Sequence, residues 1–364
     1  MTMPNQLRIA YYITPHGFGH ASRSCAIMNA LYQIIPEVHF DIFTQVPLWF
    51  FQSSLTASFS YQAVLTDIGL AQKTALAEDI PETIHRLSNF LPFEGKKFQD
   101  LVGQAKDRQY QIILCDIAPL GIAVAQATGI PSVLVENFTW DWIYESYVTQ
   151  YPPMGAFGQR LAAYFQAADY HIQTEPLCDP KSADLLTTPI SRAVRTESSL
   201  IRQQLGVSTT AKMIIITMGG IQWQYADLSA LEDTPNIFFV VPGSSEKGER
   251  RGNLILLPHH SDFFHPDLIT AADAVIGKIG YSTVAEIYQA GIPFGYIGRP
   301  GFRESKPLTQ FIKTRMQGVP FTQQQFESDT WLDYLPSLLA LPHLERSEKS
   351  GANQAAEFLA MLLE

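Results

Sequence analysis

The residues 277–291 form a pattern that could bind an anion. A short apolar run, 274–276, leads through glycines into a segment with helical spacing that Ser282 or Thr283 would open. Glycine lets a phosphate approach the backbone, and the unpaired amides and positive dipole end of a helix favour negative charge. Glu286, one turn further on, could accept hydrogen bonds from ribose hydroxyls. The pattern predicts a nucleotide diphosphate site, although ordinary strand–glycine–helix junctions and helix caps share it.

A second junction of the same kind lies near the start of the chain. The apolar run 9–13 leads into Thr14-Pro15-His16-Gly17-Phe18-Gly19-His20 and then into the helical segment 21–34. Each half of the chain therefore has a glycine loop between a strand and a helix. A dinucleotide fingerprint is an alternative interpretation of Gly17-x-Gly19-x-x-Ser22. Its third glycine is missing, however, and the second strand ends at Phe43-Thr44-Gln45 without an acid for the ribose.

Composition and charge limit the classes of protein to which the chain can belong. At 364 residues with 46% hydrophobic content, it is long enough for two domains with sizeable cores. A net charge of −10, without a run of Lys or Arg, argues against a nucleic-acid partner. Cys25, Cys115 and Cys178 lie far apart in the sequence, so neither a zinc site nor a disulfide framework is expected.

The absence of targeting patterns predicts a cytoplasmic protein. The N-terminus lacks the charged and apolar regions of a signal peptide, and no apolar run reaches the roughly 18 residues of a membrane span. The clusters Leu48-Trp49-Phe50-Phe51 and Phe90-Leu91-Pro92-Phe93 leave peripheral membrane contact open, although such residues more often pack inside a core.

Apolar runs and amphipathic segments alternate in both halves, which is the rhythm of a parallel α/β sheet. A stretch with little pattern, 179–196, is the expected linker between the domains 1–178 and 197–345. The last segment, 346–364, contains a helix with an apolar stripe that must pack on another element. The expected strands are 8–13, 38–43, 111–115, 132–135, 213–217, 237–241, 254–257, 274–276 and 293–297. The expected helices of the first half are 21–34, 81–106 and 119–128.

Together these features resemble the GT-B glycosyltransferases of the MurG-type and UDP-glycosyltransferase groups. The most specific stretch is Gly280 to Gly291, where Thr283-Val284-Ala285-Glu286 and the following Ala290-Gly291-Ile292-Pro293 read like the donor-binding helix and the strand after it. The first half is similar to the N-terminal glycosyltransferase-like domain of plant arabinokinases, through 115–119 and 137–144. The kinase half of those proteins has no counterpart here, so kinase activity is not implied.

The resemblance implies an architecture and an acceptor side. The expected fold class is α/β, with two Rossmann-like doubly wound domains facing a cleft and the segment 346–364 returning to the first domain. In inverting members of the family a histidine after the first glycine loop deprotonates the acceptor hydroxyl, and His20 occupies that place. Asp116 matches the acidic partner that orients this base and stabilises its imidazolium form.

The contacts to the acceptor are expected from Gly19, Trp140 and Trp142. Each of these assignments has a structural alternative. His20 could simply bond to backbone groups, Asp116 could cap the next helix, and the aromatic side chains could fill the core.

On the donor side the resemblance implies a nucleotide site in the second domain. Glu286 carries over as the ribose ligand, and backbone groups around His259 would hold the base. Glu304 falls near the position that grips the donor sugar, in a stretch that departs from the commonest family pattern and leaves the sugar open. The residues expected to face the phosphates are Gly219, Gly220, Gly280, Tyr281 and Ser282.

The expected function is an inverting glycosyl transfer from a nucleotide sugar, a UDP-sugar by resemblance, to a hydroxyl of a glycan, lipid or small molecule. No Asp-x-Asp pair is present to hold Mg²⁺ on the diphosphate, so the expected mechanism uses no metal and no cofactor. Two alternatives remain. One is a UDP-sugar epimerase on the same fold, and the other is a catalytically silent nucleotide-sugar-binding regulator, which would need neither His20 nor Asp116.

Overall fold

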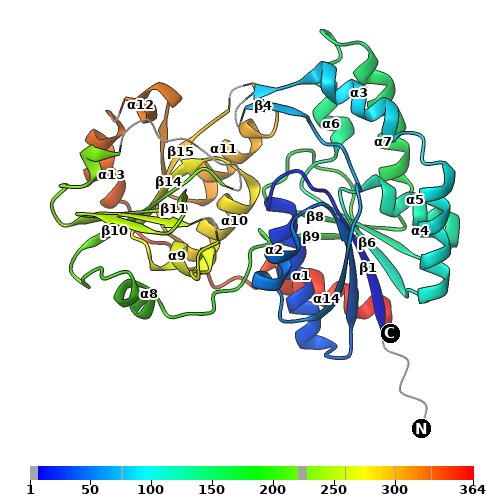
Figure 1. Ribbon diagram of the computed structural model, residues 1–364, viewed down its shortest axis with the longest axis horizontal. Coiled ribbons are helices and arrows are strands. Elements are labelled where there is room, and N and C mark those ends of the chain that lie inside the picture. Colours follow the sequence, from blue (N-terminus) through cyan, green and yellow to red (C-terminus); the bar gives the residue numbers. More distant parts are fainter. Residues whose placement is uncertain (1–6, 75–76, 220–227, 259, 300, 329) are drawn as a thin grey trace. The chain divides into compact units, whose positions relative to one another are not determined.

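A computed structural model describes residues 7–74, 77–219, 228–258, 260–299, 301–328 and 330–364. The chain divides into two compact units, the first Met1–Ser191 with Lys349–Glu364 and the second Arg192–Glu348 (Figure 1). Each unit contains its own seven-stranded, mainly parallel sheet. The expected α/β fold class with two Rossmann-like cores is therefore confirmed.

The first sheet is parallel throughout, in the order β3-β2-β1-β6-β7-β8-β9. Its strands are β1 (Arg8–Ile13), β2 (His39–Thr44), β3 (Ser58–Ala63), β6 (Ile112–Asp116), β7 (Ser132–Glu136), β8 (Tyr170–Thr174) and β9 (Leu185–Thr187). The helices of this unit are α1 (Gly19–Ile34), α2 (Leu48–Ser54), α3 (Ile80–Phe90), α4 (Gly95–Arg108), α5 (Pro119–Thr128), α6 (Trp140–Glu145), α7 (Pro153–Gln166) and α14 (Gly351–Leu363). A separate antiparallel pair joins β4 (Gln72–Thr74) to β5 (Ala77–Glu78).

The second sheet has the order β12-β13-β11-β10-β14-β15-β16, and β12 pairs antiparallel at its edge. Its strands are β10 (Lys212–Thr217), β11 (Ile237–Ser245), β12 (Glu249–Arg251), β13 (Leu254–Pro258), β14 (Ala274–Lys278), β15 (Phe294–Ile297) and β16 (Gly318–Phe321). The helices are α8 (Ser198–Gln204), α9 (His265–Ala271), α10 (Tyr281–Ala290), α11 (Ser305–Arg315), α12 (Gln323–Glu327) and α13 (Leu335–Leu339), with short 3₁₀ turns at Ser229–Leu231 and Thr330–Tyr334.

Two sequence expectations are corrected here. The helix expected over 81–106 is broken, because α3 ends at Phe90 and α4 begins at Gly95. Pro92 has no N–H to donate and disfavours the helical conformation at Leu91, which is extended. The expected linker 179–196 contains the strand β9. The sequence did not predict this strand, because three residues are too few to show an alternating pattern.

Both sheets reverse their strand order at the strand that begins the unit. β1 lies between β2 and β6, and β10 lies between β11 and β14. Ligands of open α/β sheets bind at the carboxyl ends of the strands on either side of such a switch point. In the first sheet Ile13 is paired with Asp116 at this edge, and in the second Thr217 is paired with Gly277. Both switch points therefore carry sequence-predicted motifs.

Helix α1, which carries His20, is fixed by packing on one face of the first sheet. The side chains of Ile9, Tyr11 and Ile13 on β1 point into a core that α1 and α14 cover, and α14 lies beside α1 (Figure 1). Ala355 and Leu359 of α14 are fully buried in this core. The C-terminal segment thus belongs to the first unit and supports the helix that presents the histidine.

Candidate active site

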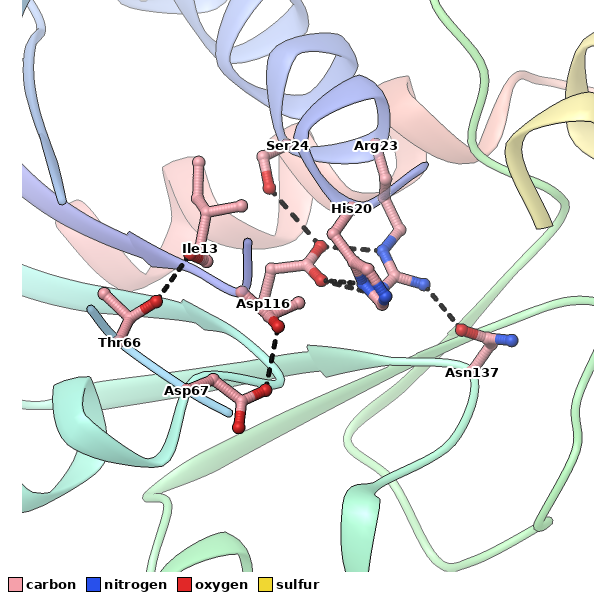
Figure 2. Close-up of polar contacts among 9 residues, drawn as sticks. Ile13, His20, Arg23, Ser24, Thr66, Asp67, Asp116 and Asn137 are labelled. Carbon is pink, nitrogen blue, oxygen red and sulfur yellow. Dashed lines mark hydrogen bonds and ion pairs between the residues drawn. The ribbon is translucent and has the colours of Figure 1, made fainter. Parts of the chain in front are cut away.

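The first unit brings His20 and Asp116 into contact at its switch point. The chain leaves β1, turns through Gly17 with a φ of +74°, and enters α1 at Gly19, so that His20 lies in the first turn. Asp116 is the last residue of β6, the neighbour of β1. The Nδ1 atom of His20 lies 2.7 Å from Oδ1 of Asp116, and both side chains are buried (Figure 2).

Arg23 is the residue of this cluster that the sequence analysis missed. Its Nε donates to Oδ2 of Asp116 at 2.8 Å, and its Nη2 donates to Oδ1 at 2.7 Å (Figure 2). Its Nη1 donates to Oδ1 of Asn137, in the loop after β7, at 2.9 Å. A signal was present: Arg23 lies three residues after His20, and residues at that spacing share one face of a helix.

These contacts determine which nitrogen of His20 carries the proton. Burial alone would raise the pKa of Asp116, but the charge of Arg23 and the hydrogen bonds from Arg23 and His20 hold that pKa below its usual value. Asp116 is therefore a carboxylate that only accepts, and Nδ1 of His20 must donate to it. Nε2 is then the unprotonated nitrogen, and no hydrogen bond to it is formed by the part of the chain that the structure describes.

Burial also keeps the imidazole neutral. It lowers the pKa of His20, Asp116 opposes this effect, and the charge of Arg23 adds to it. Since the ordinary value is already 6.5, His20 is uncharged at neutral pH. A neutral imidazole with a free Nε2 can accept a proton from a bound hydroxyl group.

The backbone that follows Asp116 is strained. Ile117 has a φ of +39°, in the left-handed region that a β-branched residue rarely adopts. Such a residue costs about 1–3 kcal/mol, and strained residues are concentrated at functional sites. The side chain of Ile117 is fully buried, so packing holds this conformation at the end of β6.

A second buried carboxylate, Asp67, lies close to the cluster (Figure 2). Its Oδ2 accepts from Oγ1 of Thr14 at 2.8 Å, while Oδ1 accepts from the N–H groups of Ile68 and Gly69. The N–H of Thr14 in turn donates to the backbone carbonyl of Asp116 at 3.2 Å. Burial raises the pKa of Asp67 to about 7, although these hydrogen bonds oppose the shift. Asp67 therefore changes charge near neutral pH.

A groove of about 1220 Å³ opens beside Asp67 within the first unit. The segment 62–70 and the helices α3 and α4 supply most of its lining, and His16 contributes from the glycine loop. Phe90 and Phe93 provide aromatic surface, and polar side chains are interspersed with them. A mixed lining of this kind suits an organic ligand.

The three residues expected at the acceptor lie in the same unit in different environments. Gly19 is half-buried and begins α1. Trp140 is fully buried, with its ring 5.0 Å from the ring of His16 and 5.3 Å from that of Phe138. Trp142 is half-buried and also packs near Phe138. Neither tryptophan lines the groove.

The second unit places the start of α10 at its own switch point. The helix begins at Tyr281 with Gly280 as its N-cap, so the expectation that Ser282 or Thr283 opens it is wrong by one or two residues. No side chain caps this end. The first amides of a helix have no partner within the helix, and such a terminus favours an anion. Gly277 explains the close strand pairing here, because a Cβ would lie 2.0 Å from the carbonyl oxygen of Thr217.

Lys278 is a second residue that the sequence analysis missed. It ends β14, two residues before Gly280. Burial lowers its pKa to about 8, the charge of Arg299 adds to this, and Glu304 opposes it. Arg299 and Glu304 are both buried, and Glu304 is the N-cap residue of α11. The start of α10 is thus bordered by a cluster of charged side chains that includes the predicted sugar ligand.

Glu286 has protein partners in this structure. Its Oε1 accepts from Nε and Nη2 of Arg192 at 3.2 and 2.9 Å, and its Oε2 lies 2.7 Å from Nδ1 of His265. Burial alone would raise its pKa, but Arg192 and His265 lower it to about 2. The carboxylate is 5% exposed. A ribose hydroxyl would therefore have to share the carboxylate with Arg192 and His265, or displace one of them.

Of the remaining residues predicted to bind the donor, the structure describes only Gly219. Gly219 follows β10, is exposed, and has a φ of +73°. Gly220 and His259 lie outside the described residues. Within the described ranges, no three His, Cys, Asp or Glu side chains gather in a way that could hold a metal ion, and no helix is long and apolar enough to cross a membrane.

Comparison with known proteins identifies the fold. No protein-family profile matches the chain. L-arabinokinase of Arabidopsis thaliana is 28% identical over an alignment 364 positions long, which covers 97% of this chain and 34% of that protein. The chain thus spans about a third of the length of this curated relative.

Solved glycosyltransferases match the structure over nearly its whole length. The spinosyn forosaminyltransferase SpnP has a TM-score of 0.62 at 14% identity, covering 98% of this chain and 99% of that one. UGT89C1 of Arabidopsis thaliana solved with quercetin has a TM-score of 0.66 at 11% identity, covering 99% and 100%. The same protein solved with UDP has a TM-score of 0.62 at 12% identity, covering 98% and 100%. The chain has the fold of these GT-B glycosyltransferases.

We expect Asp67→Asn to remove a pH dependence of folding stability. Asp67 has a pKa of about 7 in the folded protein against an ordinary 3.8, so between these values the folded state holds a proton that the unfolded state has released. Asp67 therefore adds its full contribution to the free energy of unfolding at a pH below 3.8. This contribution falls by about 1.4 kcal/mol per pH unit as the pH rises from 3.8 to about 7.

Urea unfolding of the wild type and of Asp67→Asn at several pH values measures this contribution. As the pH rises from 3.8 to about 7, the free energy of unfolding of the variant should increase relative to that of the wild type. A difference that stays constant with pH would contradict the raised pKa.

Proposed function

We propose that the chain is an inverting glycosyltransferase that moves a sugar from a UDP-sugar to the hydroxyl group of an organic acceptor. The observation that carries this proposal is the neutral, carboxylate-bound His20 with an unprotonated Nε2 at the switch point of the first sheet. The fold of the solved glycosyltransferases supports it, and so does the open helix terminus in the second unit.

The first unit is assigned the activation of the acceptor. The acceptor hydroxyl gives its proton to Nε2 of His20, and its oxygen uses the freed electron pair to attack the anomeric carbon of the donor sugar. The bond from that carbon to the diphosphate breaks on the opposite face, and its electron pair leaves with the phosphate oxygen. Asp116 stabilises the imidazolium that forms, which is the role of the carboxylate in catalytic triads.

The second unit is assigned the binding of the donor. The diphosphate accepts hydrogen bonds from the first amides of α10, and Lys278 supplies positive charge beside it. With a pKa of about 8, Lys278 is mostly protonated at neutral pH. Stabilising the charge that develops on a leaving group is a principal source of catalysis. One neighbour of the same fold was solved with UDP and another, VinC, with dTDP, which supports a nucleoside diphosphate; of the two we propose UDP.

The acceptor is assigned to the groove beside Asp67. Its aromatic and polar lining suits an organic molecule with hydroxyl groups. UGT89C1, a neighbour of the same fold, was solved with quercetin, which supports an acceptor of this general kind.

We expect His20→Ala to lower kcat by roughly 10²–10⁴, because the variant loses a positioned general base. The affinity for UDP should change little, since His20 and α10 belong to different units. Turnover is measured by mass spectrometry of the products from a panel of UDP-sugars and hydroxylated acceptors. His343→Ala, an exposed histidine of the second unit, is the matched control and should keep wild-type turnover.

Three outcomes would replace the proposal. Unchanged turnover of His20→Ala would remove this histidine from the mechanism. Conversion of the UDP-sugar into an isomer, without transfer, would indicate an epimerase. UDP binding without any reaction would favour the regulator.

The ribose contact of Glu286 is tested by calorimetric titration of UDP and of 2′,3′-dideoxy-UDP. Hydrogen bonds to a charged group contribute about 1.5–3 kcal/mol, and about 1.4 kcal/mol corresponds to tenfold in affinity. The dideoxy compound should therefore bind the wild type roughly ten- to a hundredfold more weakly. Glu286→Gln should weaken UDP and reduce the difference between the two ligands.

Glutamine is the preferred replacement at Glu286, because alanine would leave Arg192 buried without a partner. Glu327→Gln, at an exposed position of α12, is the matched control. Equal binding of UDP and its dideoxy analogue to the wild type would show that the carboxylate serves only Arg192 and His265.

A further inference from the structure

Arg23 has no part in the proposed reaction so far, yet it is a charged residue that lies almost completely buried beside the base. Its side chain is 1% exposed, and it lies on α1 one turn after His20. It contacts both oxygens of Asp116 and the amide oxygen of Asn137. A buried guanidinium is costly unless it is paired, and here Asp116 and Asn137 pair it.

The geometry of Arg23 fixes the position of Asp116. Two hydrogen bonds from one planar guanidinium, to Oδ1 and Oδ2, prevent the carboxylate from turning. The hydroxyl of Ser24 adds a contact to Oδ2 at 3.3 Å. Oδ1, the oxygen that His20 contacts, is therefore held in one place. A lysine could supply the same charge, but it could not form the planar fork.

The charge of Arg23 matters as much as its shape. An uncompensated carboxylate at 2.7 Å would stabilise the imidazolium form of His20 and so hold a proton on the base before any acceptor is bound. The guanidinium cancels this charge. The sum over Asp116, Arg23 and a neutral His20 is zero, and the uptake of one proton makes it +1. The base is thus unprotonated at rest and can still return its proton after transfer.

We propose that Arg23 is a positioning residue of the base, which clamps Asp116 against Nδ1 of His20 and cancels its charge so that Nε2 stays available to an acceptor hydroxyl. The assignment of His20 as a base rests on the proposed function. The electrostatic part of the proposal does not, because it concerns the free protein.

Other titratable groups face this cluster and must be separated from it. Tyr11 on β1 and Cys115 on β6 are buried, and burial raises the pKa of both, so they remain neutral. Asp67 is connected through Thr14 and titrates near neutral pH. His16 lies on the loop before α1 and packs on Trp140. Asp67→Asn is therefore needed as a control background.

The test is a pH titration of the histidine rings by NMR in protein labelled with ¹³C and ¹⁵N at histidine. His20→Gln identifies the signal of His20 among the nine histidines. In Arg23→Gln the pKa of His20 should rise above its wild-type value, since Asp116 is no longer neutralised. In Arg23→Lys it should stay close to the wild-type value, because the charge is kept. Asp67→Asn should leave the order of these values unchanged.

Activity provides the second readout once an acceptor is known. Arg23→Lys should lower kcat by about ten- to a hundredfold, because Asp116 is misplaced. The acid limb of its pH profile should stay at the same pH as in the wild type. In Arg23→Gln that limb should move to higher pH. A loss of kcat without these differences in the NMR titration would indicate a structural role only.

The Asp116→Asn background keeps the test decisive if Arg23→Gln alone does not fold. There, Arg23→Gln removes a buried cation that has lost its carboxylate counterion, so the double variant should be the more stable, and the pKa of His20 should be higher in it than in Asp116→Asn. Equal pKa values for His20 with and without Arg23, in either background, would overturn the proposal. Inactivity toward every UDP-sugar, with the NMR order preserved, would instead contradict only the proposed function.

Discussion

The buried ion pair between Arg23 and Asp116 is the interaction on which the candidate site depends. Both side chains are almost completely removed from water, and burying either charge without the other would be costly. Because the pair is neutral as a unit, Asp116 can accept from His20 without binding a proton itself. The ion pair holds Asp116 in place as a carboxylate, and the contact of that carboxylate with Nδ1 of His20 then sets the tautomer of the ring.

The second unit uses buried charge in a comparable way. The buried arginines of the described residues are Arg23, Arg192 and Arg299, and each lies at one of the candidate ligand sites. Arg192 is paired with Glu286, and Arg299 lies near Lys278 and Glu304. The chain as a whole has a net charge of −10, so these buried arginines place positive charge locally in an otherwise acidic protein. Pairing of this kind keeps a polar site assembled in the absence of its ligand.

Much of this architecture follows from the sequence pattern. Short apolar runs predicted most strands, and the two predicted glycine junctions lie at the two switch points, where the carboxyl ends of neighbouring strands meet at one edge. The pattern could not show the break at Pro92 within an otherwise helical stretch, nor β9, whose three residues are too few for a period. The apolar stripe of α14 required a partner, and the structure supplies α1.

The side-chain partners were harder to predict than the backbone. His20 and Asp116 are separated by 96 residues, and the fold resemblance was needed to connect them. Arg23 was visible only as a charge on the same helical face as His20. The pairing of Glu286 with Arg192 spans 94 residues and joins a helix to a segment without regular structure, so no local spacing indicates it. Lys278 ends a buried strand, where its partial burial could not be inferred from sequence.

The most direct measurement of the central claim is the ¹⁵N spectrum of the His20 ring at neutral pH in the free protein. The two ring nitrogens of a neutral histidine have distinct chemical shifts, and these report which one carries the proton. The account predicts a neutral ring with the proton on Nδ1 and a bare Nε2, as the contact with Asp116 requires. A proton on Nε2, or a doubly protonated ring at this pH, would contradict it.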